Sequence, residues 1–510
     1  MNRRLSGACF VSGGRIAAGL DARTAEVREN QAVSTLTGRT AIVPAPPNPR
    51  ERLALVLGRA AGNVVRRLWH SGGTALPGLV AGALAPSLVE RLARQPGHGV
   101  VTVTGTNGKT TTTHLLAAIL RHAGVEPLTN PSGSNLERGL VTAYTASVDG
   151  RGALPGAAQR AGLFEVDEAA LARLMPRLRP RIAVFLNLFR DQLDRYGEVD
   201  SVAEGWARAL DVVEPPAVLV LNADDPSIAQ LAEHARGGRV VTFGVDDDAA
   251  ALAHAEHASD ARFCTCGSRF VYAAIYMGHV GRWRCPSCGR ARPAPEVSAR
   301  RVTLREDGST VEVAIGGESF TVDLPLAGLY SVYNALAATA AAHALGVPAA
   351  KIAEALAQAG PAFGRQERFE IAGERVRLLL AKNPAGLNEV LRLLTVAAPP
   401  LTVLAMLNDG VQDGQDVSWI YDADVEMIAG TGATVVCSGD RADDLALRFA
   451  LAGVAPISVI AQTERALDAA LARTPPGGRL DVIATYTAMM DVRAALARRA
   501  GVGAYWEAKR

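Results

Sequence analysis

One segment of this 510-residue chain has the residue types that bind the phosphates of a nucleotide. It follows the apolar run Val100–Val103 and reads Gly105-Thr106-Asn107-Gly108-Lys109-Thr110-Thr111. Backbone N–H groups in such a turn and in the helix after it bind phosphate oxygens, while Lys109 neutralises charge and Thr110 can hold Mg²⁺. The common P-loop has a glycine where this chain has Val103, so only the second half of that pattern matches. We expect ATP here; a chance Gly-Lys-Thr is the alternative.

Four of the six cysteines lie within 25 positions and have the spacing of a metal site. They form two pairs, Cys264 with Cys266 and Cys285 with Cys288. Two such knuckles can present four thiolates to Zn²⁺, so we predict a zinc ribbon inserted at about 258–296. The first knuckle has only one residue between its cysteines and must bend differently, which keeps free buried cysteines as the alternative. So few cysteines are typical of a reducing compartment.

The predicted ribbon has a basic flank, formed by Arg282, Arg284, Arg290 and Arg292. A basic ribbon can bind nucleic acid, but no ladder of aromatic residues accompanies these arginines. The net charge of the whole chain is only +2. We therefore expect a structural ribbon and no nucleic acid as partner.

Carboxylates are concentrated in the segment after the apolar run Leu401–Met406, at Asp409, Asp413, Asp416 and Asp422. Loops at the carboxyl ends of parallel strands are where α/β domains place their chemistry. Taken alone, the segment also fits a solvated turn or a calcium-like cluster.

Short apolar runs alternate with helical periodicity from His98 onward, which predicts an α/β fold class. Buried parallel strands are expected at 100–103, 182–186 and 217–221. A second series follows Gly360, near 376–380, 401–406, 434–436 and 480–485. We expect an ATP-binding P-loop domain over 50–360 and a Rossmann-like C-terminal α/β domain over 361–510.

The N-terminal region differs in character from the rest of the chain. Residues 1–49 lack periodicity and end in a proline-rich stretch, which predicts a disordered tail. From Arg50, arginines are interspersed with apolar residues at helical spacing, namely Leu53, Val56, Leu57, Ala60, Val64 and Leu68. We expect this helix to pack against the next domain, with a membrane-surface role as the alternative. We expect neither a membrane span nor an export signal.

The form Gly-Thr-Asn-Gly-Lys-Thr and several later segments resemble the Mur ligase family, whose members activate a carboxylate with ATP. The resemblance implies that Lys109 and Glu165 are catalytic and that Glu165 holds Mg²⁺ with Thr110, Glu168 being the second candidate. Gln192 stands where the family has a metal-binding histidine. A second Mg²⁺ site of the ordinary type is therefore not expected.

Two further segments of the family assign residues to the nucleotide. The turn after the expected strand at 217–221 resembles an adenine-binding turn, which implies Asn222 as a cofactor ligand. Phe363-Gly364-Arg365 resembles the hinge whose arginine faces the ATP phosphates. In the third domain, however, Lys382-Asn383 stands where ordinary members carry an aspartate toward the ribose.

Taken with the ribbon and the acidic loop, this departure resembles the Mur-ligase-like subunits of lipid II isoglutaminyl synthase. The resemblance implies a ligase of peptidoglycan synthesis. Its reaction would convert the D-glutamate α-carboxylate of the lipid II stem peptide to D-isoglutamine through an acyl phosphate. The expected place is the cytoplasm at the inner face of the cell membrane, which the protein would contact only through lipid II.

Ammonia must then come from elsewhere, because a Cys-His glutaminase needs a reactive cysteine on a sharp turn. Cys9 lies in the tail, and Cys437 lacks a glycine two residues before it. The resemblance implies a separate glutaminase, GatD, in a heterodimer or larger complex. Asp416 is our choice for the catalytic carboxylate that orients the partner's histidine, with Asp409, Asp413 and Asp422 as alternatives.

Two other functions compete with this one. A complete Mur or folylpolyglutamate-type ligase would add an amino acid rather than ammonia, but the third-domain aspartate is missing. A zinc-ribbon ATPase that binds nucleic acid is disfavoured by the near-neutral charge.

Overall fold

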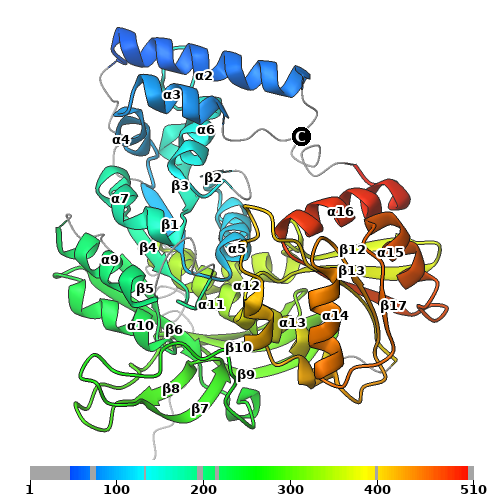
Figure 1. Ribbon diagram of the computed structural model, residues 1–510. Helices are drawn as coiled ribbons and strands as arrows, with labels where there is room; N and C mark the ends of the chain where they lie inside the picture. Colours follow the sequence, from blue (N-terminus) through cyan, green and yellow to red (C-terminus); the bar gives the residue numbers. More distant parts are fainter. Residues whose placement is uncertain are drawn as a thin grey trace, which may run out of the picture.

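The structure is a computed structural model that describes residues 46–68, 76–130, 134–191, 199–212, 218–396 and 400–503. Two of the predictions fall outside these ranges: the tail as far as residue 45, and Gln192 at the family's histidine position. Figure 1 shows two α/β parts, each built around its own sheet.

Within the described residues the larger sheet has nine strands in the order β11-β10-β9-β6-β5-β4-β1-β3-β2. Short runs of valine, leucine and isoleucine form its centre because they fit a pleated surface that is buried on both faces. The part from β9 to β2 is parallel and consists of β1 (Val100–Thr104), β2 (Glu126–Thr129), β3 (Arg160–Glu165), β4 (Ile182–Phe185), β5 (Val218–Asn222), β6 (Arg239–Val245) and β9 (Val297–Arg305). Strands β1, β4 and β5 are the three predicted from apolar runs.

The far edge of this sheet is antiparallel, and the apolar runs of the sequence did not predict it. Strand β10 (Gly308–Ile315) pairs antiparallel with β9 on one side and with β11 (Glu318–Leu324) on the other. Exposed residues interrupt the apolar ones along β9 and β11. Such half-exposed strands lack the continuous apolar runs from which the strands were predicted.

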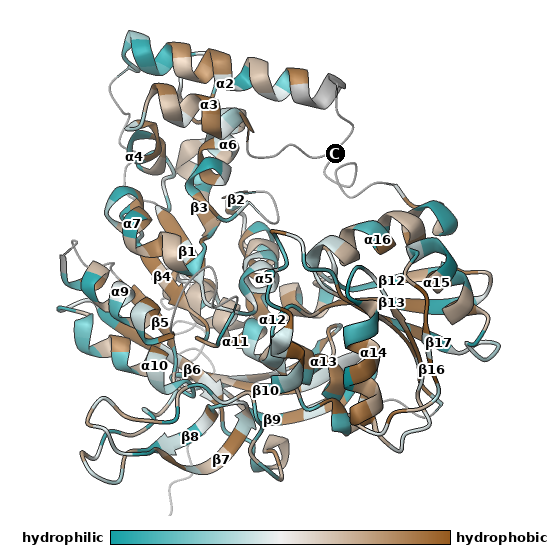
Figure 2. Ribbon diagram, in the orientation of Figure 1, coloured by the Kyte–Doolittle hydropathy of each residue, from teal (hydrophilic) through white to brown (hydrophobic). Residues whose placement is uncertain are grey.

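Helices cover both faces of the larger sheet and form a separate core on each (Figure 2). One core contains α5 (Lys109–His122), α11 (Leu329–Ala344) and α12 (Ala349–Gln358). The other contains α3 (Leu76–Leu84), α4 (Leu88–Ala93), α6 (Glu137–Ser147), α7 (Glu168–Leu178) and α9 (Val199–Val212). Shorter turns between them are α10 (Pro226–Ala229), η1 (Ala157–Gln159), η2 (Gln230–His234) and η3 (Asp248–Ala250).

The smaller sheet has six strands among the described residues, in the order β12-β13-β17-β14-β15-β16. It is parallel except for the pairing of its edge strand β12 with β13. The bounds are β12 (Arg365–Ile371), β13 (Glu374–Leu380), β14 (Thr402–Met406), β15 (Thr434–Ser438), β16 (Ile457–Val459) and β17 (Arg479–Ala484). The four strands predicted after Gly360 are β13, β14, β15 and β17.

Helices again pack on both faces of this smaller sheet. One face carries α13 (Pro384–Thr395), α14 (Ala442–Leu451), η4 (Ser418–Asp422) and η5 (Val425–Ile428). The other carries α15 (Thr463–Leu471) and α16 (Tyr486–Ala500). The acidic segment after β14 therefore lies at the carboxyl edge of this sheet.

Helix α2 (Pro49–Leu68) begins at the last residue of the predicted tail. Asn48 and Glu51 form a capping box, in which each side chain accepts from the other's backbone N–H (2.8 and 3.0 Å). The buried residues among those described on this helix are Glu51, Ala54, Leu55, Gly58 and Gly62.

The predicted apolar face of α2 points the other way. Leu53, Val56, Leu57, Ala60 and Val64 are exposed, so α2 packs against α3 and α6 as expected, but not through these residues. The physical reason is close approach. A Cβ on Gly58 would lie 3.0 Å from the Pro77 carbonyl oxygen, so only small residues fit between α2 and α3. None of the helices that the structure describes is long and apolar enough to cross a membrane.

Candidate active site

The phosphate-binding segment connects β1 to α5 at the centre of the larger sheet, where the neighbours of β1 are β3 on one side and β4 on the other. In α/β sheets such a point opens a crevice at the carboxyl ends of the strands. Gly105 and Gly108 have φ angles of 136° and 89°, which favour glycine. A Cβ on Gly108 would also lie 2.1 Å from Oδ1 of Asn334 in α11. The turn therefore depends on glycine for both conformation and space.

The residues after β4 hold this turn in place. Thr106 and Asn107 donate their backbone N–H groups to the carbonyl and side-chain oxygens of Asn187 (3.0 and 2.9 Å). The Asn187 amide in turn donates to the Asn107 carbonyl (3.1 Å). The Thr106 hydroxyl lies 3.0 Å from the Phe189 carbonyl and 2.9 Å from its N–H. The loop is therefore fixed before any ligand binds.

Two short contacts bring the predicted catalytic and metal-binding residues together. Lys109 Nζ lies 3.0 Å from the carboxylate of Glu168 and donates to the Gly105 carbonyl (2.6 Å). The Thr110 hydroxyl donates to Glu165 Oε2 (2.8 Å). Glu165 ends β3, where Asn130 fixes its backbone N–H (3.0 Å). Thr111 is buried in the same first turn of α5.

Side chains from the smaller sheet complete this cluster. Lys382 follows β13 and forms an ion pair with Asp191. The amides of Asn383 and Asn107 bond each other across the two sheets (3.0 and 3.3 Å). Arg365 opens β12 and donates to the Phe363 carbonyl (3.1 Å). Together these contacts connect the P-loop to the C-terminal part of the chain.

Burial makes the charges of this cluster strongly dependent on one another. Burial raises the pKa of Glu168, against the attraction of Lys109 and Lys382. Burial opposes the charge of Lys382, but nearby carboxylates raise its pKa overall. The pKa of Arg365 is lowered by burial, which the Glu165 carboxylate only partly offsets. No ion pair to Arg365 is formed among the residues that the structure describes, so this cation suits an incoming anion.

Asn222 is fully buried at the end of β5. Its amide donates to the Leu186 carbonyl (2.9 Å), and its Oδ1 accepts from the Asp224 N–H (3.0 Å). These bonds connect the turn after β5 to the residues that follow β4. A contact between Asn222 and adenine stays a prediction.

The same turn is held from the other side by the hairpin of β7 (Val271–Met277) and β8 (Val280–Arg284). The contacts are Trp283 Nε1 to the Ala223 carbonyl (3.0 Å), Gly281 N–H to the Asp224 carbonyl (2.8 Å), and His279 Nε2 to Asp225 Oδ2 (3.4 Å). The His279 Nδ1 accepts from a backbone N–H (3.3 Å), so Nε2 carries the proton. The hairpin therefore forms one wall of the turn.

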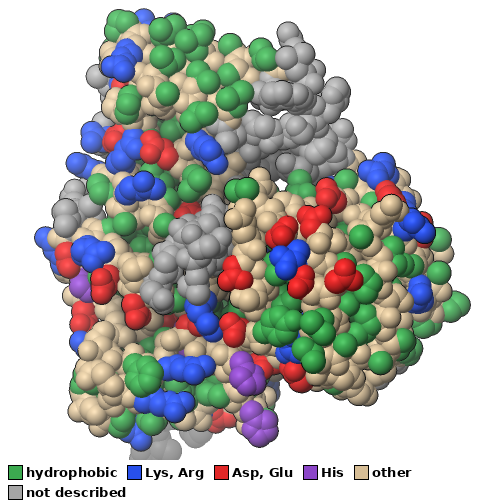
Figure 3. All heavy atoms as spheres, in the orientation of Figure 1, with side chains coloured by type: hydrophobic (Ala, Val, Ile, Leu, Met, Phe, Trp, Pro, Cys, Tyr) green, Lys and Arg blue, Asp and Glu red, His purple; other side chains and the backbone are tan. Residues whose placement is uncertain are grey.

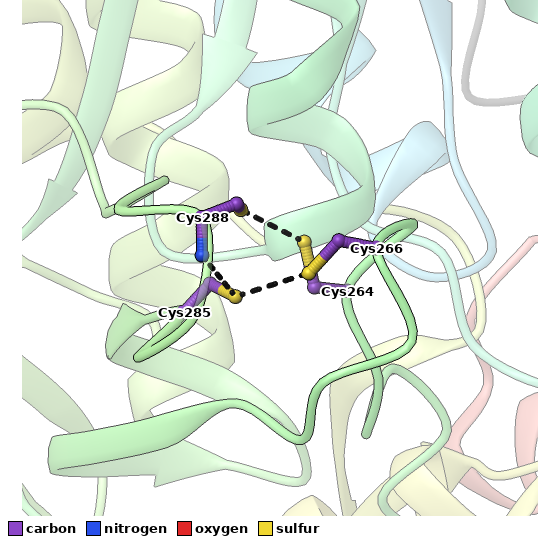
Figure 4. Close-up of side chains that lie close together, drawn as sticks. All are labelled: Cys264, Cys266, Cys285 and Cys288. Atoms are coloured by element: carbon purple, nitrogen blue, oxygen red, sulfur yellow. Dashed lines mark hydrogen bonds between the residues drawn. The ribbon is translucent and has the colours of Figure 1, made fainter.

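The four cysteines converge at the end of this hairpin (Figure 4). Their sulfur atoms all lie within 4.8 Å of one another. The Cys264 and Cys288 sulfurs are 3.6 Å apart, and those of Cys266 and Cys285 are 3.5 Å apart. The Cys288 N–H donates to the Cys285 sulfur and lowers the pKa of that thiol to about 6. A single ion can contact all four sulfurs, despite the shortened first knuckle.

The acidic segment after β14 is arranged differently. Asp413 is buried and accepts from the backbone N–H and hydroxyl of Thr487 (2.8 and 2.5 Å). Asp409 pairs with Arg441 (3.3 Å), and Asp422 lies 3.5 Å from Arg190.

Asp416 is exposed and accepts a local hydrogen bond from the Ser418 N–H (2.8 Å). Hydrogen bonds from Ser418 lower the pKa of Asp416. Among the four acids Asp416 is the most exposed residue, whereas Asp409 and Asp422 are partly exposed and face arginines.

Comparison with known proteins places this site in a family. A model of the Mur ligase middle domain matches residues 103–282, and one of the MurT ligase C-terminal domain matches residues 380–489. Over 459 residues the chain is 31% identical to the lipid II isoglutaminyl synthase (glutamine-hydrolyzing) subunit MurT of Streptococcus pneumoniae, with 89% of this chain and 98% of that one covered. The chain belongs to the MurT family.

A second MurT subunit, from Staphylococcus aureus strain COL, is 30% identical over 431 residues, which cover 83% of this chain and 92% of that one. Among solved structures, a pseudomurein peptide ligase type C from Methanothermus fervidus matches with a TM-score of 0.59 at 22% identity, covering 80% of each chain. That likeness shows the Mur ligase fold. As a MurT family member, the chain is an enzyme of the Mur ligase family.

Sequence reasoning did not assign two residues that this MurT family site contains, Lys382 and Asn383. It noted them only as a departure from ordinary Mur ligases. A usable signal was present: an asparagine followed by proline is an N-cap followed by the first helical residue. Asn383 indeed caps α13, accepting from the Gly386 N–H (2.8 Å). A helix start directly after a predicted strand marks the carboxyl edge, where the site lies.

Proposed function

We propose that this MurT family member amidates the D-glutamate α-carboxylate of the lipid II stem peptide to D-isoglutamine, using ATP and ammonia from a partner glutaminase. The relatives that it resembles over most of its length are named as subunits of lipid II isoglutaminyl synthase. The observation that carries the proposal is the cluster around the P-loop. There Lys109, Lys382 and Arg365 provide positive charge beside the Thr110–Glu165 pair.

The residues present fit ATP and Mg²⁺. Arg365 is a desolvated cation, and Asp191 has a buried oxygen, Oδ1, without a hydrogen-bond partner in the described structure. Thr110 and Glu165 would hold Mg²⁺, because hydroxyl and carboxylate oxygens are its preferred ligands. When bound, the ion would neutralise charge on the phosphates. Lys109 would turn from Glu168 toward the same phosphates, and Arg365 would reach them from the C-terminal part.

The proposed reaction has two steps whose atoms balance. A carboxylate resists attack by ammonia because its charge and resonance deactivate the carbonyl carbon. In the first step a carboxylate oxygen bonds to the γ-phosphorus and ADP leaves, which gives an acyl phosphate. In the second step ammonia attacks the carbonyl carbon, inorganic phosphate leaves with the bonding electrons, and one proton passes from the nitrogen to the phosphate, which leaves a neutral amide. Lys109 and Arg365 would stabilise the charge that builds up on the transferred phosphoryl oxygens.

The cysteines fit a structural Zn²⁺. Zinc–sulfur bonds of about 2.3 Å in a tetrahedron place sulfur atoms about 3.8 Å apart. The contacts of 3.5 and 3.6 Å are close to that spacing. Cys264, Cys266, Cys285 and Cys288 would thus hold an ion that supplies folding energy to a hairpin with a small core of its own.

Ammonia would come from a second polypeptide of the GatD type. Burial raises the pKa of the Cys437 thiol to about 12, so it is a poor nucleophile at neutral pH. Exposed Asp416 would orient the partner's catalytic histidine. Figure 3 shows hydrophobic side chains gathered over α14, where Leu447 and Leu451 are exposed one turn apart. Such a patch next to η4 suits a protein partner.

The test combines the chain, the glutaminase, ATP, glutamine and lipid II, and measures the mass of the lipid product. We expect the mass decrease of a hydroxyl replaced by an amino group, and its loss with Lys109→Ala. Lys351→Ala is the matched control, because Lys351 is an exposed lysine on α12. If Lys109→Ala amidates lipid II at the normal rate, the proposal fails. Product formation with an amino acid in place of glutamine would point to the amino acid ligase instead.

A further inference from the structure

A row of large apolar side chains lies on the outside of the N-terminal helices. We call it the outer strip: Leu53, Val56, Leu57 and Val64 of α2 with Leu76 and Leu79 of α3. Each has between 37% and 60% of its surface exposed. Figure 3 shows hydrophobic side chains over this end of the molecule. Exposed apolar residues scattered singly are ordinary, but six large ones on two helices that pack together indicate a binding surface.

The orientation of α2 is fixed by specific contacts, so the strip is not a chance result of a loosely attached helix. On the inner side, Gly58 fits against Pro77 and Ala81 with little room for a side chain. Arg59 donates to carbonyls at the end of α6, including those of Thr145 (3.0 Å) and Asp149 (2.9 Å). These bonds satisfy carbonyls that a helix end leaves free. The large side chains therefore face outward in a defined way.

The charge around the strip has one sign. Between residues 46 and 84 the chain has five arginines and a single acid, Glu51. Glu51 is buried and pairs with Arg91 (3.4 Å). Arg50 and Arg52 are exposed beside the strip. The surface of α2 thus combines an apolar face with arginines and no exposed acid, the composition of helices that lie in a membrane interface.

We propose that the outer strip docks onto an anionic lipid surface, with its leucine and valine side chains at the boundary between headgroups and acyl chains. Arg50 and Arg52 would lie among the lipid phosphates. A protein partner fits this strip less well than it fits α14, where Asp443 and Asp444 lie beside Arg441 and offer both signs of charge. The proposal goes beyond the amidation reaction, because it concerns binding to lipid without substrate.

The experiment is co-sedimentation of the full chain with vesicles, in the absence of ATP and lipid II. One set is phosphatidylcholine alone and the other contains phosphatidylglycerol as well. We expect binding to the anionic vesicles that weakens as salt increases. The double variant Leu53→Glu with Val56→Glu should reduce the partition coefficient by at least about tenfold, because two exposed side chains lose their apolar burial. Leu447→Glu on α14 is the matched control and should bind like the parent chain.

Three results would overturn the proposal: equal binding to both kinds of vesicle, no binding to either, or unchanged binding by the double variant. A monomer–dimer equilibrium abolished by the double variant would also overturn it, since the strip would then contact a second copy. Thermal melting of both variants checks the fold, and the more conservative Val56→Ser repeats the test if the double variant melts early. A negative result in the vesicle experiment says nothing about amidation, and a negative amidation assay says nothing about vesicle binding.

Discussion

The carboxyl ends of the two sheets carry similar residue types but use them in opposite ways. At the end of β1 and β3, acids and cations are buried and contact one another, as in the Lys109–Glu168 and Thr110–Glu165 pairs. At the end of β14 the acids are spread over a loop, and Asp416 is exposed. The first region already has its partners in this chain, whereas the second presents a carboxylate outward. The comparison separates a buried cluster of mutually paired charges from an exposed acidic loop.

Glu165→Ala should have the largest effect of the variants on activity. The substitution removes the Glu165 carboxylate, which contacts Thr110 and is itself a proposed ligand of Mg²⁺. We expect amidation to fall by about a hundredfold or more, with ammonia as well as with glutamine, because phosphoryl transfer itself is impaired. The rates are measured by ADP release with each nitrogen source. If Glu165→Ala lowered only the rate with glutamine, the P-loop cluster would not be the site of phosphoryl transfer, and the proposed separation from the acidic loop after β14 would be wrong.

Asp416→Asn should separate the two nitrogen sources. The variant keeps the shape of the loop but removes the charge offered to the partner's histidine. We expect the glutamine-driven rate to fall by about a hundredfold, while the rate with added ammonium salt stays near normal. Parallel assays on the same complex measure both. Equal loss of the two rates would place Asp416 in the phosphoryl-transfer site instead.

Removing metal from the cysteines should act at a distance, because the hairpin holds the turn Ala223–Asp225. Chelation or Cys285→Ser should lower the melting temperature by roughly 5 °C or more. Affinity for ATP should fall by about tenfold, as measured by titration calorimetry. Cys437→Ser should keep the response to chelator, since Cys437 lies in the other sheet. Unchanged ATP binding after complete zinc removal would show that the hairpin and the turn are independent.

Asp413→Ala should mainly affect stability rather than nitrogen transfer. It leaves the Thr487 N–H and hydroxyl without their acceptor, which should cost about 1–3 kcal/mol. Asp416→Ala should cost less than about 1 kcal/mol, because it loses only local hydrogen bonds from Ser418. Urea unfolding of the two variants compares them directly. If Asp416→Ala lowered the free energy of unfolding more than Asp413→Ala did, Asp413 rather than Asp416 would be the candidate for a functional carboxylate.

The smallest effect is expected at His257, which pairs with Asp424 of the C-terminal part. The hydrogen bond and charge of Asp424 raise the pKa of His257. The folded pKa then exceeds the unfolded value, so the stabilisation is complete below pH 6.5 and is lost as pH rises through the raised pKa. His257→Ala should cost about 0.2–1 kcal/mol at pH 5.5, because the His257 side chain is largely exposed, and nothing at pH 9. Thermal melts at both values provide the check.

Local patterns predicted the parts of the molecule that depend on local chemistry. The strand before Gly105, the turn itself and the start of α5 follow from glycine and apolar spacing. The four cysteines were expected together from their spacing alone, and the structure brings their sulfurs within contact distance of one another.

Long-range packing was less predictable. Periodicity selected the large residues of α2 as the buried face, but close helix packing buried Ala54 and Gly58 instead. The contact of Asn383 with Asn107 spans 276 positions, so no local pattern reveals it.

The contacts between the β7–β8 hairpin and the turn after β5 have a consequence for synthesis on the ribosome. Ala223 emerges 60 residues before Trp283, which donates to it, and Asp224 emerges 68 residues before Arg292, with which it pairs. At roughly 5–20 residues per second this delay lasts several seconds. Throughout that interval the nascent turn lacks the bonds to Trp283 and Arg292 and is held only by residues up to Val245. Nucleotide affinity should therefore arise late, once the cysteines have left the exit tunnel.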